Sequence, residues 1–309
     1  MSQRDAIAGV VQVCGIVLLA PLLPGLTQWT KARLEGRRGA SPLQPYRELA
    51  RLWGKSVVDP EGTGPVYRLA PAIVAAALAL AGLLVPIAGH APGWPVGHDA
   101  FALVGLLALA RFALAAATWD TANGFGLQGA SRELAISVAV EAALVVALAC
   151  GALAASTTDL RAMAAASAGL PVWSNPAQTL ALLAFLLVVV AETGRQPVDN
   201  PDTHLELTMI HEGPLLEYAG RDLALLQWAT AARHWLVLAL AAAVFLPHPA
   251  GFAAGLATLP LLLAAVAVGL GLLETLVAKL RILLVPRVLG AGAGLALLAF
   301  ISRLIESGR

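Results

Sequence analysis

The sequence predicts an all-α polytopic membrane protein, with about eight transmembrane helices and an acidic cytoplasmic loop between the fifth and the sixth. Hydrophobic residues make up 59% of the 309 positions and charged residues only 13%. Apolar runs recur at close to the roughly 20 residues that a helix needs to cross a bilayer. Because no stretch between these runs suits a soluble domain, we expect one integral membrane domain over residues 1–309.

The eight predicted spans differ in how clearly they begin and end. The first follows Arg4, but its apolar run is too long for a signal peptide and ends in PLLPG, without an A-x-A site. The apolar part of the fifth is about 22 Å long, which is shorter than the roughly 30 Å of hydrocarbon that it should cross. We place the spans at residues 6–26, 69–88, 100–117, 134–155, 175–191, 229–246, 253–273 and 288–305.

The distribution of Lys and Arg predicts the orientation of these spans. Short loops that carry positive charge stay in the cytoplasm. Fifteen Lys and Arg residues fall on the side of the first loop, and only Arg4, Arg161, Arg303 and Arg309 fall on the other side. Both termini are therefore expected outside, and the acidic loop inside.

Composition argues against several kinds of site. Twenty basic and nineteen acidic residues give a net charge of +1, which leaves no basic surface for nucleic acid. Cys14 and Cys150 lie in apolar runs, and an iron–sulfur cluster needs about four thiolates. His204 and His211 would lie about 10 Å apart on a helix, too far for one metal ion. We expect no metal site and no cofactor in this chain.

The acidic loop, residues 191–222, is the main candidate for function. Its charges could belong to a solvated loop, but ionisable groups at the edge of the hydrocarbon are costly and often mark ion or proton routes. Pro197 and Pro201 interrupt any helix there, and Glu206 could also cap a short helix. The histidines could relay protons or be structural. The candidates for proton or ion coupling in this loop are Glu192, Asp199, His204, Glu206, His211, Glu212, Glu217 and Asp222.

Charged residues inside the third and fourth spans form a second candidate. Arg111 and Glu141 each lie roughly 12 Å below the cytoplasmic end of their helices, so we expect them to pair. Glu133 shares a helix face with Glu141 and leads from the surface inward. The alternatives are a purely structural ion pair and, for Glu133, a place in the first turn after a glycine-rich loop that ends at an N-cap, Ser131. Arg233 and His234, in the sixth span, are explained by snorkelling.

The first loop contains an amphipathic stretch, residues 46–58. It could anchor the chain at lipid headgroups or provide a docking surface for a cytoplasmic partner. The residues that we assign to partner docking in the cytoplasmic loops are Arg37, Arg38, Gln44, Arg47, Arg51, Arg195, Lys279, Arg281 and Arg287.

Several motifs carry a resemblance to a known superfamily. The acidic loop has the pattern AE-x-x-R-x-P-x-D-x-P, followed by EL and EY-x-G, from Ala191 to Gly220. It resembles the respiratory-chain complex I subunit 1 family, which includes the H subunit of bacterial complex I and the membrane subunit of energy-converting [NiFe] hydrogenases and formate hydrogenlyase. Similar fragments occur at Arg38-Gly39, at residues 129–133 and at residues 278–287.

Departures from the complex I pattern favour the hydrogenase-type branch. Val198 stands where complex I usually has Phe, and His204 where it has Glu. The complex I run R-Y-D-Q-L-M is missing after Pro286-Arg287, which argues against a quinone-contacting end like that of complex I. The acidic loop looks closer to hydrogenase and formate hydrogenlyase subunits.

The resemblance implies a non-catalytic membrane anchor and proton- or ion-coupling subunit of a hydrogenase-type redox complex. Its implied partners are a large subunit and an iron–sulfur small subunit on the cytoplasmic side, which would hold the [NiFe] centre and iron–sulfur clusters, and antiporter-like membrane subunits. The implied location is the bacterial or archaeal cytoplasmic (inner) membrane, in contact with the lipid bilayer. Whether quinone binds stays open.

Three alternatives remain. The first is the quinone-site H subunit of a complex I type NADH:quinone oxidoreductase. A stand-alone secondary transporter is less favoured because no internal repeat is visible. A purely structural anchor would not need charges within its spans.

Overall fold

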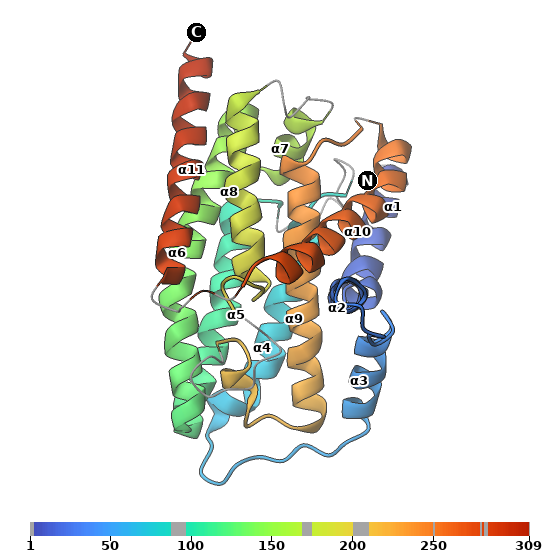
Figure 1. Ribbon diagram of the computed structural model, residues 1–309, viewed down its shortest axis with the longest axis vertical. Coiled ribbons are helices and arrows are strands. Elements are labelled where there is room, and N and C mark those ends of the chain that lie inside the picture. Colours follow the sequence, from blue (N-terminus) through green and yellow to red (C-terminus); the bar gives the residue numbers. More distant parts are fainter. Residues whose placement is uncertain are drawn as a thin grey trace.

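The computed structural model describes residues 3–87, 97–168, 175–199, 210–249, 251–278, 280 and 284–308 (Figure 1). This part of the chain forms helices and no strands. The elements are α1 (Gln3–Cys14), η1 (Gly15–Leu19), α2 (Leu22–Leu34), α3 (Gln44–Trp53), α4 (Pro65–Leu84), α5 (Ala100–Thr121), α6 (Gly124–Ala155), α7 (Leu160–Ser167), α8 (Pro176–Glu192), η3 (Gly213–Leu215), α9 (Gly220–Leu240), η4 (Ala241–Phe245), α10 (Phe252–Leu276) and α11 (Val285–Ser307).

Each predicted span lies mostly on one helix or, for the first span, on the consecutive helices α1, η1 and α2, which confirms the all-α membrane fold. Within the described residues, six helices are long and apolar enough to cross a bilayer: α4, α5, α6, α9 with η4, α10 and α11. A seventh is obtained if α1–η1 and α2 are counted as one span. Helix α8 has only 17 residues, in keeping with the short fifth run.

The first span is broken, whereas we expected a continuous helix over residues 6–26. The chain bends by 51° between η1 and α2. Pro21, at the break, has no backbone N–H and disfavours a straight helix there. As a result, α2 is seen almost end-on in Figure 1 while most of the other helices run vertically, and α10 lies obliquely beside it.

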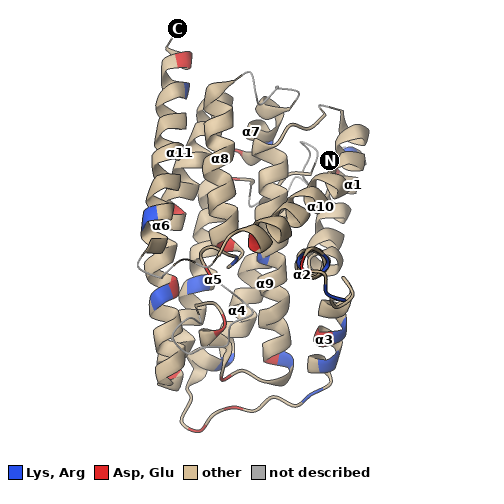
Figure 2. Cartoon of the chain, viewed as in Figure 1, with Lys and Arg blue, Asp and Glu red and all other residues tan. Residues whose placement is uncertain are grey.

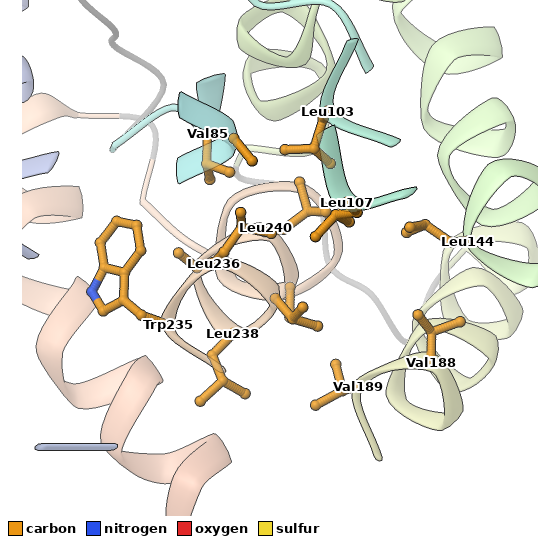
Figure 3. Close-up of a cluster of buried hydrophobic side chains, with 14 of the residues drawn as sticks. Val85, Leu103, Leu107, Leu144, Val188, Val189, Trp235, Leu236, Leu238 and Leu240 are labelled. Atoms are coloured by element: carbon orange, nitrogen blue, oxygen red, sulfur yellow. The ribbon is translucent and has the colours of Figure 1, made fainter. Parts of the chain in front are cut away.

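Helix α9 occupies the centre of the bundle. Trp235, Leu236, Leu238 and Leu240 are each at most 1% exposed. Figure 3 shows these side chains among those of neighbouring segments, including Val85, Leu103, Leu107, Leu144, Val188 and Val189. Small residues let the backbones come close, which is how helices pack in lipid. At Gly15, for example, a Cβ would lie 2.5 Å from a ring atom of Trp235.

Helix α6 begins at Gly124, well before the predicted fourth span. The Asn123 side chain caps it by accepting hydrogen bonds from the backbone N–H groups of Phe125, at 2.8 Å, and Gly126, at 3.4 Å. The expectation of a glycine-rich loop capped by Ser131 is therefore wrong. The glycines lie within the helix, and Gly129 allows close contact: a Cβ there would lie 3.0 Å from Gly213 Cα.

The two chain ends both lie in the upper half of Figure 1, and α3 lies at its lower end. Figure 2 shows Lys and Arg on α2 and α3 and at the lower ends of the bundle, with further charged residues at mid-height. The charged residues of the candidate site belong to α5, α6, α8, α9 and α10 and to the segment that follows α8.

Candidate functional site

Arg111, in α5, is shared by two carboxylates. Its Nη1 donates to Glu141 Oε1 on α6, and its Nη2 donates to Glu192 Oε1 at the end of α8. The Arg111 and Glu192 side chains are 4% and 1% exposed, and that of Glu141 is 28% exposed. The predicted Arg111–Glu141 pair is confirmed. The structure adds Glu192, so the acidic loop is joined directly to the charges within the spans.

A second ion pair lies beside the first. Arg233 Nη1, on α9, lies 3.5 Å from Glu133 Oε1 on α6. Arg233 and the adjacent His234 are buried, at 8% and 4% exposure, so snorkelling does not describe them. His234 Nδ1 lies 3.0 Å from the Thr230 carbonyl oxygen, which can only accept. In the neutral imidazole the proton is therefore on Nδ1, and Nε2 keeps a lone pair.

A third group of charges joins the acidic loop to the bent first span and to α10. Arg195 Nη1 lies 3.2 Å from Glu274 Oε1, and Lys31 Nζ on α2 lies 3.9 Å from Glu274 Oε2. The Glu274 side chain is fully enclosed, and those of Arg195 and Lys31 are 5% and 10% exposed. Two cations thus share one carboxylate, the reverse of the arrangement around Arg111.

A cavity of about 340 Å³ lies between these groups. Its polar wall contains Glu133, Glu192, Arg195, Arg233 and His234. Apolar side chains of α2, α3, α4, α5 and α9 complete it: Pro21, Pro24, Leu49, Val74, Leu78, Leu114 and Leu226. Three buried atoms of lining residues have no hydrogen-bond partner in the described structure: Glu192 Oε2, Arg233 Nε and His234 Nε2. The cavity therefore combines an apolar wall with unsatisfied donors and acceptors.

The acidic loop closes on itself beside this cavity. His211 Nδ1 lies 3.1 Å from Asp199 Oδ2, and both residues line the cavity together with Glu212. Gly194 makes room for the imidazole: its φ is +60°, and a Cβ there would lie 2.9 Å from His211 Nδ1. Three of the predicted coupling residues are thus brought to one place.

The end of the acidic loop is attached to the lower ends of α4 and α6. The Tyr67 and Tyr218 rings stack with centroids 4.3 Å apart. Tyr67 Oη donates to the Glu217 carbonyl oxygen at 2.7 Å, and the Glu217 carboxylate accepts from the Asn123 side chain. Burial raises the pKa of Tyr218, so its hydroxyl stays protonated and donates to the Tyr67 carbonyl oxygen at 3.0 Å. Glu217 therefore belongs to this attachment rather than to the group around Arg111.

The other predicted residues lie elsewhere. Asp222 is half-buried in the first turn of α9. Glu206, His204, Lys279 and Arg281 lie outside the described residues. Among the residues predicted for docking, Gln44 is half-buried and donates to Glu48 at 2.8 Å, and Arg195 is interior rather than on a docking surface. The others are exposed: Arg37, Arg38, Arg47, Arg51 and Arg287.

The sequence-based prediction missed Lys31, Glu274 and the pairing of Arg233. A signal existed for each, because a charge inside or at the end of an apolar run is costly unless it is paired. The pairing itself could not be predicted, since Arg195 and Glu274 are 79 positions apart. In the described residues, no group of three or more His, Cys, Asp or Glu side chains could hold a metal ion.

Known proteins resemble this chain over most of its length. Residues 7–302 match a family model described as NADH dehydrogenase. Formate hydrogenlyase subunit 4 of Escherichia coli (strain K12) is 33% identical over 301 residues, 95% of this chain and 97% of that protein. Hydrogenase-4 component C of the same organism is 32% identical over 305 residues, 96% of this chain and 95% of that protein.

Two further proteins match this chain at lower sequence identity. The H subunit of the NADH-quinone oxidoreductase of Chlorobium luteolum is 28% identical over 211 residues, 66% of this chain and 56% of that protein. A chain in the structure of the membrane-bound sulfane sulfur reductase, an archaeal respiratory membrane complex, has a TM-score of 0.81 at 19% identity, covering 97% of this chain and 99% of that one. This last match supports the fold.

Proposed function

Because this chain belongs to the NADH dehydrogenase family, we propose that it is the membrane anchor and proton- or ion-coupling subunit of a hydrogenase-type redox complex. The observation that carries the proposal is the buried chain of contacts from Glu192 through Arg111 to Glu141. It connects the acidic loop to a carboxylate of α6 that is 28% exposed. The hydrogenase branch is favoured by two relatives that match over nearly the whole chain.

The proposed partners are those of a hydrogenase-type complex. The redox chemistry would belong to a large subunit and an iron–sulfur small subunit, which would hold the [NiFe] centre and iron–sulfur clusters. They would dock at the lower end of Figure 1, on the side of α3, which carries the exposed basic residues Arg47 and Arg51. Antiporter-like subunits would lie beside the chain in the bilayer. We place the assembly in the bacterial or archaeal cytoplasmic membrane, with both termini outside.

The geometry suggests how coupling would proceed. In a low-dielectric interior, two carboxylates that share one guanidinium influence each other strongly. When Glu192 takes up a proton, Arg111 loses one of its two charged partners and its attraction to Glu141 strengthens. A change of charge or position in the acidic loop would therefore alter the ion pair between Arg111 and Glu141 on α6. Glu192 is one of the cavity-lining residues, and its Oε2 is buried without a hydrogen-bond partner in the described structure, which favours uptake of a proton there.

Glu192→Gln tests this role because it keeps the shape of the side chain and removes its charge. We expect the variant complex to assemble and to transfer electrons to an artificial acceptor, while proton uptake in vesicles falls at least tenfold. Glu306→Gln is the control, because it makes the same substitution in another ion-paired glutamate. Glu306 pairs with Arg303 at 3.0 Å near the C-terminus, away from the cavity. Wild-type proton uptake by Glu192→Gln would remove Glu192 from the coupling path, and failure to assemble would assign it to structure.

The cavity also supports the alternative, a quinone-site H subunit. Its apolar wall suits an isoprenoid tail, and its unsatisfied polar atoms suit the carbonyl or hydroxyl groups of a quinone. One preparation separates the two functions. Purification of the native complex with nickel and no stoichiometric quinone supports the hydrogenase type. NADH-oxidising partner subunits with bound quinone support the alternative.

A further inference from the structure

Arg195 binds Glu274, although Glu192, which has an unpartnered carboxylate oxygen, lines the same cavity. Glu192 Oε2 is buried and has no hydrogen-bond partner in the described structure. The Arg195 side chain lines the same cavity, as does the Asp199 carboxylate. Arg195 follows Glu192 by three residues, and a guanidinium that reached the unpartnered oxygen would bind it, because charge-assisted hydrogen bonds are strong in a buried site. In this structure Arg195 binds Glu274 instead.

Glu274 is well placed to hold Arg195. Its two oxygens lie 3.2 and 3.5 Å from Arg195 Nη1. It stands in the last turn of α10, where Gly271 and Ala267 bring α2 close. A Cβ on Gly271 would lie 2.9 Å from the Thr27 carbonyl oxygen, and Thr27 Oγ1 donates to the Ala267 carbonyl oxygen at 3.1 Å. The backbone that carries Glu274 is therefore held by the packing of α2 against α10.

The backbone gives the same attachment a second contact. Leu280 N donates to the Pro197 carbonyl oxygen at 3.1 Å. The backbone N–H groups of Val198 and Asp199 both donate to the Arg195 carbonyl oxygen, which forms a tight turn around Arg195. The main-chain conformation at Arg195 is thus stabilised by backbone hydrogen bonds and does not depend on its guanidinium. The contact with Glu274 mainly determines the direction of the guanidinium.

We propose that Glu274 is a positioning residue that keeps the Arg195 guanidinium away from Glu192 and Asp199. Glu192 is then left with Arg111 as its hydrogen-bonded cation and with Oε2 unpartnered in the described structure, while Arg233 and His211 line the same pockets without a hydrogen bond to it. Without Glu274, Arg195 turns to Glu192 and holds it permanently ionised, so Glu192 no longer exchanges protons. This inference rests on the proposed coupling role of Glu192.

The test compares Glu274→Gln with the double variant Glu274→Gln/Arg195→Gln in the purified complex. We expect the single variant to lose proton uptake in vesicles at least tenfold while electron transfer to an artificial acceptor persists. Adding Arg195→Gln removes the misdirected cation and should restore at least half of the wild-type uptake. If Glu274 only anchored the loop, the second substitution would bring no recovery, and that result would overturn the inference.

Two further variants complete the design. Lys31→Gln removes another cation beside Glu274 and leaves the Arg195 contact, so it should lower uptake much less than Glu274→Gln. Should Glu274→Gln not assemble, Glu274→Asp replaces it: the shorter carboxylate should hold Arg195 less well, lower uptake partially and respond to Arg195→Gln. An absence of loss or of recovery in this pair counts against the inference.

The Glu192→Gln complex, measured in parallel, separates the two claims. Loss of uptake in Glu192→Gln but not in the Glu274 variants would overturn the positioning role alone. Wild-type uptake in Glu192→Gln would overturn the coupling role itself.

Discussion

At the scale of single residues, the most informative feature is the unequal sharing of charge. Arg111 serves two carboxylates, and Glu274 serves two cations. Removing one partner of a buried ion pair costs about 3 to 5 kcal/mol, because the other charge stays buried and unpaired. A residue shared by two partners should therefore be harder to replace than either partner.

A double-mutant cycle on Arg111 and Glu141 tests this. Arg111→Ala should lower complex recovery and thermal stability more than Glu141→Ala, since it leaves two carboxylates unpaired and Glu141 is partly exposed. The double variant should lose less than the sum of the two single losses. Thermal unfolding of the purified complex gives the comparison, and additive losses would contradict a direct interaction.

At the scale of elements, the acidic loop is attached to two different groups of helices. Arg195 and Pro197, near its start, contact α10 and the segment after it. Its end packs on α6 through the close approach of Gly129 and Gly213, and on α4 through Tyr218. The loop therefore bridges two parts of the bundle.

Gly129→Leu should detach the end of the loop. The new side chain would meet Gly213 Cα and Pro214 Cδ, each 3.0 Å from the position of the Cβ, and backbone atoms there cannot give way without a shift of the loop. We expect faster protease cleavage of residues 210–219 in membranes and a loss of proton uptake. Gly105→Leu on α5 is the control, because its Cβ would point into open space within the chain. Equal cleavage of both variants would argue against the contact.

At the scale of the whole molecule, both chain ends lie in the same half of the bundle, opposite α3 (Figure 1). An even number of crossings, as we predict, would place both ends on one side; it requires the broken first span and the short α8 to cross as well. The positive residues of the first loop would then face the cytoplasm.

Reporter fusions test this orientation. A reporter fused after Gly39, in the first loop, or after Gly213, in the acidic loop, should give a cytoplasmic signal. A fusion after Ser156, between α6 and α7, should give the opposite one, because α6 ends there at the other side of the bundle. A signal from outside at Gly39 or Gly213 would reverse the proposed topology.

Local properties of the sequence were enough to predict where the chain is helical and which charges are unusual. Apolar runs of membrane length produce helices wherever they occur, and a charge inside such a run needs a partner. Equal depth even predicted the partner of Arg111, since α5 and α6 are consecutive helices joined by a short turn.

The remaining partners depend on the tertiary fold. Glu192 meets Arg111 across 81 positions and Arg195 meets Glu274 across 79, so each contact depends on how distant helices pack. The break after η1 turns α2 toward α10 and brings Lys31 beside Glu274. The glycine-rich start of α6, which we expected to be a loop, is part of a continuous helix. It lets the backbone of the acidic loop pack closely against that helix. Hydrophobic pattern specifies a helix locally, whereas ion pairing between distant segments depends on the packing of the whole bundle.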